Sequence, residues 1–145
     1  MHSPRPDPYK NFKFRVKHFD THVAGVSEIS GLDAVLVSGY TFDLSTGPLE
    51  YTPLVLRRGV THDGSFQLWA RTGHTSGRHL ARASRPRDLT IDEFNDAGER
   101  VSILQVYRCW VSQYRALQEL KSGEPYAGIQ LMQLEHEGWN LDRLE

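Results

Sequence analysis

Alternating residues near the start of the chain mark an extended hairpin. Apolar and basic residues take turns from Phe12 to Lys17. Successive side chains of a strand point to opposite faces, so this segment predicts a strand with one apolar and one basic face. A turn at Asp20-Thr21 and a break at Ser30-Gly31 bound a second strand. The pattern therefore predicts a two-faced β-hairpin that holds no catalytic residue.

Further short segments have the composition of strands. They cover residues 32–37, 54–56, 89–94, 101–114 and 129–137. In the longest of them, the odd-numbered residues 101–111 and the even-numbered residues 102–112 both include apolar side chains, so we expect it to be covered on both faces. In the last, Ile129 and Leu131 are expected to lie opposite Met132 and Leu134.

A short helix is expected between two of these strands. Asp63 or Ser65 can cap its first turn, because the side-chain oxygen of either accepts an unpaired backbone N–H. Phe66 and Trp69 lie three residues apart, share a helix face, and are expected to plug an open end of the sheet or barrel. Loops are expected at 38–53 and 71–86, and a tight turn at 95–98.

Short strands, regular turn signals and one short helix predict a mainly β protein, an antiparallel β-barrel or sandwich. Residues 1–8 contain three prolines and are expected to form an extended arm, followed by a single domain over residues 9–145. The length of 145 residues suits one domain with one core. No apolar run approaches the roughly 20 residues that a membrane-spanning helix needs.

Charge is unevenly distributed, although the net charge is −1. Residues 1–20, 21–56, 57–87 and 88–145 carry net charges of +3, −4, +6 and −6. Such blocks suit a protein that contacts copies of itself or a charged partner, and they equally suit a solvated surface.

Little in the sequence indicates chemistry. Cys109 is the single cysteine, which indicates a reducing compartment, and inside a strand-like segment it is expected to be a packed residue. The histidine pairs His18/His22 and His74/His79 lack the spacing of zinc ligands. No phosphate-binding glycine loop and no nucleophile elbow is present. We therefore expect no enzyme activity, cofactor or metal.

Arginines of the segment 71–87 leave a second function open. Clustered arginines can contact phosphates, which would make the chain a nucleic-acid-binding module. The segment lacks the interleaved aromatic residues that bases stack on, and a solvated loop is the alternative. The residues concerned are Arg71, Arg78, Arg82, Arg85 and Arg87.

Four segments together resemble a known family. The first supplies Asp7, Pro8, Tyr9, Asn11 and Phe12, then Ala24, Gly25, Ser27, Glu28, Ser30, Gly31 and Leu32. Landmarks within residues 53–69, 87–99 and 130–138 follow in order, the last ending in His136-Glu137-Gly138. The chain thereby resembles the tail tube proteins of contractile phage tails and related injection systems over most of residues 7–142.

The resemblance implies a structural role. Subunits of this family are expected to join through sheet edges into hexameric rings. The rings stack into a conduit that sheath contraction drives into a target. The implied partners are copies of the chain, other tube-layer proteins, and sheath and baseplate proteins, with nucleic acid only as cargo. Assembly in the cytoplasm into a phage or phage-tail-like particle is implied too. The segment 38–52 is shorter than in typical members, which fits a baseplate-proximal layer.

Two sets of contact residues are expected from this resemblance. Ring or stacking contacts are assigned to Tyr9, Phe12, Tyr40, Phe42 and Tyr51. Sheath or baseplate contacts are assigned to Arg71, Arg78, Arg82, Arg85 and Arg87.

Overall fold

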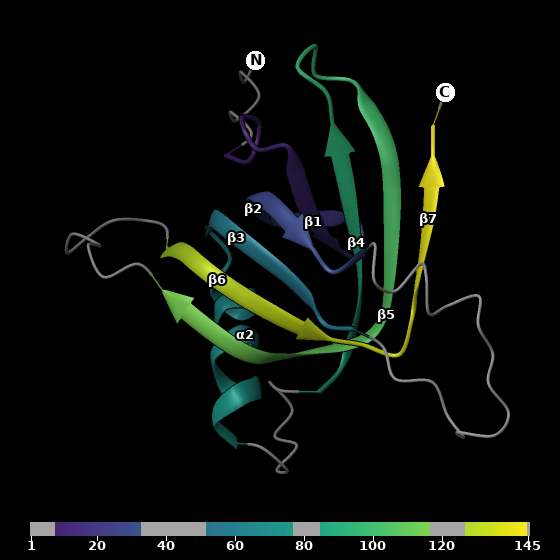
Figure 1. Ribbon diagram of the computed structural model, residues 1–145. Helices are drawn as coiled ribbons and strands as arrows, with labels where there is room; N and C mark the ends of the chain where they lie inside the picture. Colours follow the sequence, from purple (N-terminus) through teal and green to yellow (C-terminus); the bar gives the residue numbers. More distant parts are fainter. Residues whose placement is uncertain (1–7, 33–51, 77–84, 117–126, 145) are drawn as a thin grey trace, which may run out of the picture.

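The computed structural model describes residues 8–32, 52–76, 85–116 and 127–144 (Figure 1). Their helix and strands are β1 (Phe14–His18), β2 (Thr21–Ser30), β3 (Leu54–Thr61), α2 (Gly64–Ser76), β4 (Arg87–Phe94), β5 (Arg100–Ala116), β6 (Ala127–Glu135) and β7 (Trp139–Arg143). The expected arm, the segment 33–37 and most of the loop 38–53 lie outside the described residues.

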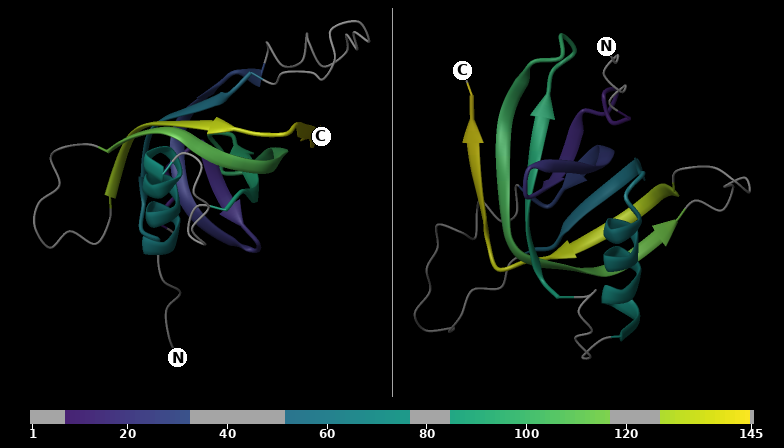
Figure 2. Two further views of the ribbon diagram at one scale, coloured as in Figure 1. Left: turned by 90° about the horizontal axis from the view of Figure 1, so that it is seen from below. Right: turned by 180° about the vertical axis from the view of Figure 1, so that it is seen from behind.

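All the strand pairs are antiparallel, in the order β4-β1-β2-β3-β6-β5-β7. An additional pairing of β4 with β5 closes six of these strands into a barrel, and β7 lies outside the ring on the border of β5. Figures 1 and 2 show β5 bending from the upright β4–β5–β7 layer into the layer that it forms with β6 and β3. The predicted fold class, a mainly β barrel with a helix, is confirmed.

The predicted first hairpin is present. Phe14 pairs with Val26 and His18 with Thr21, so the tip consists of Phe19 and Asp20, one residue earlier than expected. The break at Gly31 is also confirmed, because its φ of +109° lies in a region that favours glycine.

The long strand β5 contains a bulge that its sequence pattern does not reveal. Val106 pairs with Leu89, but Cys109 pairs with Arg87, so β5 holds one residue more than β4 here. Arg108 has a φ of +48° at this point. A bulge of this kind shifts the alternation by one residue. Therefore the predicted grouping of the odd-numbered residues 101–111 on one face is wrong beyond residue 107.

The expected cover on both faces of β5 is also wrong. Leu104, Val106, Cys109 and Val111 are buried, whereas Tyr107 and Trp110 on the outer face are 40% and 37% exposed. The error arises because large aromatic side chains also occur on solvent-exposed faces, so apolar composition alone does not predict burial.

In β6 the expected opposition of side chains is wrong as well. Ile129 is fully buried together with Met132 and Leu134. The register with β5 shifts between the pairs Arg115–Leu131 and Ala116–Ile129, which turns Ile129 to the core side. The strand β7 that follows was not anticipated as a separate element.

Helix α2 begins as predicted and ends later than predicted. The carboxylate of Asp63 accepts a hydrogen bond from the Phe66 N–H at 2.9 Å, which makes Asp63 the N-cap. The helix continues to Ser76, so the expected loop from residue 71 is wrong for 71–76. Extending an existing helix is far easier than starting one, which explains how a polar segment follows the capped turn.

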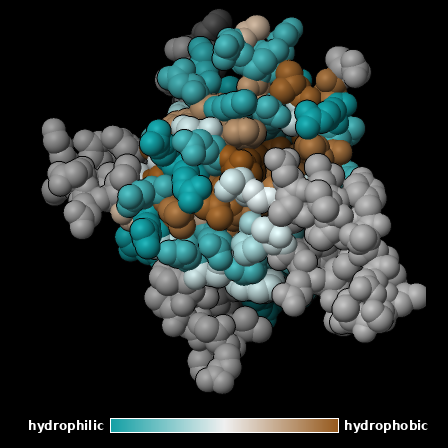
Figure 3. Space-filling model, in the orientation of Figure 1, coloured by the Kyte–Doolittle hydropathy of each residue, from teal (hydrophilic) through white to brown (hydrophobic). Residues whose placement is uncertain are grey.

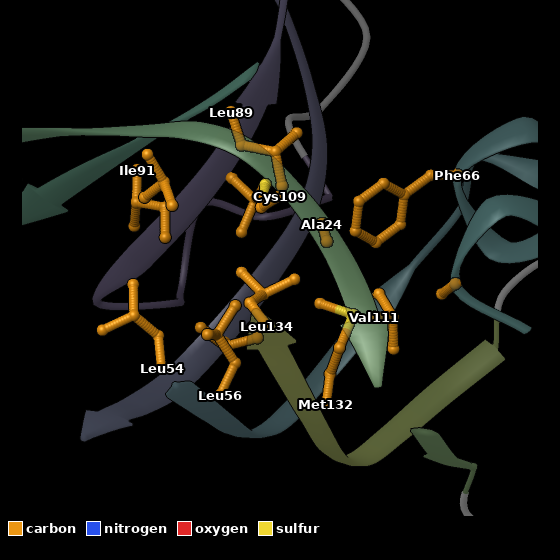
Figure 4. Close-up of a cluster of buried hydrophobic side chains, with 14 of the residues drawn as sticks. Ala24, Leu54, Leu56, Phe66, Leu89, Ile91, Cys109, Val111, Met132 and Leu134 are labelled. Carbon is orange, nitrogen blue, oxygen red and sulfur yellow. The ribbon is translucent and has the colours of Figure 1, made fainter. Parts of the chain in front are cut away.

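The core lies between the barrel strands and α2. Phe66 and Trp69 are both 1% exposed, and their ring centroids are 5.5 Å apart. Figure 4 shows Phe66 reaching from the helix towards Ala24, Cys109 and Val111, with Leu54, Leu56 and Leu134 in the opposite part of the cluster. The two helix aromatics thus cover one side of the barrel interior, in agreement with the plug that the sequence predicted.

Two glycines offer a matched test of how closely the sheet packs. A Cβ on Gly59 would collide with the carbonyl oxygen of Gly25 on the paired strand β2, whereas a Cβ on Gly64 would meet nothing within 4 Å. We expect Gly59→Ala to lower the free energy of unfolding by about 2–3 kcal/mol, as overpacking does. Gly64→Ala is the control, with unchanged or slightly raised stability in the same chemical denaturation experiment. Equal stabilities of the two variants would contradict the close approach.

Candidate assembly surfaces

The strand β7 forms an open border of the sheet. Its pairing with β5 begins with the Tyr107 N–H bonded to the Gly138 carbonyl and ends with the Leu144 N–H bonded to the Val101 carbonyl, both at 2.9 Å. In an antiparallel ladder the bonded residues alternate. The N–H groups of Trp139, Leu141 and Arg143 therefore point away from β5. Within the described ranges, no strand pairs with that border.

A second open border lies on β2. The pairing with β1 reaches only as far as Val26, while the pairing with β3 continues to Ser30. Residues 27–30 thus have a strand partner on one side alone among the described residues. Unpaired strand edges attract further strands, and proteins that do not use them cover them.

A corner of hydrogen bonds fixes β7 relative to the barrel. His136 is buried, with its Nε2 2.9 Å from the Thr52 carbonyl oxygen. Its Nδ1 accepts the Gly138 N–H at 3.0 Å, so Nε2 carries the proton and donates to Thr52. The His136 imidazole thus joins the segment just before β3 to the turn between β6 and β7. The His-Glu-Gly landmark of the sequence is therefore a structural corner.

The same corner holds the bulge of β5. The carboxylate of Asp88 accepts the Arg108 N–H at 2.9 Å, and the Arg108 guanidinium lies 3.2 Å from the Glu137 carboxylate. Sequence reasoning missed this arrangement because its members are far apart in the chain.

Two of the three basic side chains that alternate along residues 13–17 lie near carboxylates of β4. Lys13 lies 3.7 Å from Glu93, and Lys17 lies 3.8 Å from the buried carboxylate of Asp92, which His22 and Arg100 also approach. Arg15, between these lysines, packs its guanidinium 3.7 Å from the centroid of the Phe94 ring, so β4 contacts all three basic side chains.

An apolar cleft opens between the two open borders. It has a volume of about 210 Å³ and is walled by Phe14, Ile29, Leu32, Ile91, Leu104 and Leu141, with Glu93, Ser102 and Arg143 at its polar side. We call it the mouth of the barrel. Figure 3 shows apolar surface in the middle of the face that carries it. Its walls come from β1, β2, β4, β5 and β7, so only the closed sheet assembles it.

Two of the expected ring-contact residues are engaged within their own chain. Tyr9 is 4% exposed, and its hydroxyl donates to the Val23 carbonyl at 3.1 Å and accepts the His62 N–H at 2.9 Å. Phe12 is half-buried where a side chain on Gly25 would otherwise lie. Their assignment to a contact between copies stays a prediction. The other three residues, Tyr40, Phe42 and Tyr51, lie outside the described residues.

The structure describes three of the five expected contact arginines, since Arg78 and Arg82 lie outside it. Arg71 is exposed on α2, and Arg85 is exposed just before β4. Arg87 instead packs its guanidinium 5.1 Å from the centroid of the Trp69 ring. Burial lowers the pKa of Arg87, and the Asp63 carboxylate opposes that change. The sheath or baseplate contact of these arginines, and phosphate binding by them, stay predictions.

Two features are missing from the described part of the chain, a metal-binding group of side chains and a helix that could span a membrane. In its four ranges, no three His, Cys, Asp or Glu side chains gather closely enough to hold a metal ion. His79 lies outside these ranges, and His18 and His22 belong to the hairpin. The same part of the chain contains no helix with the length and apolar character that a bilayer crossing needs.

Comparisons with known proteins agree with the architecture. The family model of the T4-like virus tail tube protein gp19 matches residues 10–140. A solved anti-feeding prophage cap, described as a tube-terminating cap, is 16% identical with a TM-score of 0.50, covering 99% of this chain and 97% of that one. The extended sheath-tube complex of the PVC extracellular contractile injection system gives 19% identity and a TM-score of 0.52, covering 94% and 93%. No curated protein sequence matches the chain.

The corner at His136 can be tested by its removal. We expect His136→Ala to lower the free energy of unfolding by about 2–4 kcal/mol, because it leaves the Thr52 carbonyl and the Gly138 N–H without partners. Glu137→Ala is the neighbouring control. It removes only an exposed ion pair, so its cost is about 1 kcal/mol or less in the same urea titration. A small effect at His136 would refute its structural role.

Cys109 provides a test of the buried bulge region. Burial raises the pKa of its thiol to about 12, so at pH 8 only about one thiol in ten thousand is ionised. We expect no reaction of the native chain with a thiol-specific chromogenic reagent at pH 8. Complete reaction should follow in denaturant, where the thiol regains its ordinary pKa. Rapid labelling of the native chain would show that this part of the core opens.

Proposed function

The chain belongs to the T4-like virus tail tube protein gp19 family, and from this premise we propose that it forms hexameric rings that stack into the inner tube of a contractile particle. The tube acts as a conduit that a contracting sheath drives into its target. Its role is mechanical and involves no catalysis. The ring assembles in the cytoplasm before the particle is complete.

The open borders are the observation that carries this proposal. The outward N–H groups of β7 and the half-paired stretch 27–30 of β2 are two different edges of one chain. Joining unlike edges is a head-to-tail contact, and such contacts close into a ring when the rotation between copies allows it. Backbone hydrogen bonds between neighbours would then satisfy groups that have no strand partner among the described residues.

The remaining features agree with a rigid wall. The pairing of β4 with β5 closes the barrel, and β4 carboxylates pair with Lys13 and Lys17. Arg71 and Arg85, which are exposed, supply together with Arg78, Arg82 and Arg87 the surface for a sheath or baseplate protein. We place the chain in a baseplate-proximal or bulk layer of the tube, among other tube-layer proteins.

The proposal is tested by the purified chain itself. We expect electron microscopy to show six-fold rings at high protein concentration, and stacked cylinders at higher concentration still. A population of compact monomers alone, at every concentration and in the presence of the cognate sheath protein, would refute the assembly.

Hydrogen exchange read residue by residue locates the contact within the ring. The amides of Trp139, Leu141 and Arg143 should exchange rapidly in dissociated chains and become protected on assembly. The amides of Asn140 and Asp142 are the internal control, because the alternation bonds them to β5 in both states. Unchanged exchange at the first three amides would show that β7 is not the joined border.

A further inference from the structure

The hairpin tip between β1 and β2 carries an unexplained aromatic residue. Phe19 is 84% exposed and has a φ of +58°, a conformation that bulky residues seldom adopt. Two-residue hairpin turns favour Asn and Gly at such positions. The only aromatic neighbour of Phe19 among the described residues is the His18 ring, at 4.3 Å between centroids. The tip therefore departs from the preferred turn residues, and the single chain gains almost no burial from it.

The mouth of the barrel is a mainly apolar cavity that no side chain of the described residues fills. Its volume of about 210 Å³ exceeds the roughly 150 Å³ of an apolar cavity that accepts benzene, so a phenyl ring fits. Leu32, Ile29 and Leu141 are half-buried walls that a ring would cover.

The charges beside these two features are complementary. Asp20 is exposed next to Phe19, and Arg143 is exposed at the polar side of the mouth. Neither side chain forms an ion pair within the described ranges. An aromatic ring followed by a carboxylate thus matches an apolar cavity beside a guanidinium, which can bind a carboxylate through two parallel hydrogen bonds.

The two features cannot meet within one chain. Phe14 lines the mouth at the start of β1, and Phe19 follows the other end of that strand, five residues further on. At about 3.3 Å a residue this places them roughly 16 Å apart, on the same rigid strand. A knob and a cavity at opposite ends of an element join one copy to the next in a head-to-tail series.

We propose that Phe19 of one copy inserts into the mouth of a second copy, where the Asp20 carboxylate pairs with the Arg143 guanidinium. This inference rests on the proposed tube function and adds a side-chain contact to the joining of strand borders. One arrangement thereby accounts for the exposed phenylalanine, the apolar mouth, and two charges that form no ion pair among the described residues.

The knob is tested by Phe19→Asn. Asparagine tolerates the left-handed conformation, so the variant should unfold at an unchanged or higher temperature than the unaltered chain. Its assembly should nevertheless weaken, and the protein concentration for half-maximal assembly should rise at least tenfold in sedimentation. Leu68→Asn is the matched control, since Leu68 is 53% exposed on α2 and should not affect assembly. Loss of assembly in the control as well would overturn the specific contact.

A charge exchange tests the paired residues. Asp20→Arg and Arg143→Asp should each weaken assembly at least tenfold, because each places like charges together at the contact. The double variant should restore most of the loss, which a purely structural effect of either change would not do. Restoration identifies Asp20 and Arg143 as partners across copies.

The outcomes separate this contact from the general function. Rings or tubes that form unchanged with Phe19→Asn, or a double variant no better than the single ones, overturn the contact and leave the tube function standing. A complete lack of association in the unaltered chain overturns both.

Discussion

The pairing of the long strand β5 with three other strands organises this molecule. Its 17 residues bond to β4 and β7 in the first half and to β6 in the second. A single strand can serve these layers only if it bends, and the bulge at Arg108 provides the bend. The Asp88 carboxylate accepts the Arg108 N–H of the bulge, and His136 holds the corner beside it, so side chains from β4 and from the β6–β7 turn fix this part of the barrel.

That closure also determines what remains open. Residues 110–116 of β5 pair with β6 alone among the described residues. The far side of β7 and one side of residues 27–30 of β2 likewise have no strand partner there. The borders of β7 and β2 lie beside the apolar mouth, because Ile29 and Leu141 belong to its walls. Backbone edges and apolar surface at one place are what a subunit needs for joining a neighbour with little rearrangement.

Three described residues other than glycine have a positive φ, namely Phe19, Arg58 and Arg108. Phe19 and Arg108 both adopt backbone conformations that favour glycine or asparagine. Arg108 is compensated within the chain by Asp88 and Glu137, whereas Phe19 is not. This uncompensated departure from local preference is the observation behind the proposed contact between copies.

The sequence by itself determined the hairpin of β1 and β2, the Asp63 cap, the plug of Phe66 and Trp69, the buried Cys109 and the family resemblance. These features follow from alternation, capping chemistry and residue order, which neighbouring residues fix. It misplaced Val111 and Ile129, missed β7 as an edge, and offered no sign that Tyr9 is buried against Val23. Only the tertiary structure decided these points. A bulge or an open border is defined by the register between strands that are distant in the chain, and alternation within one strand carries no information about that register.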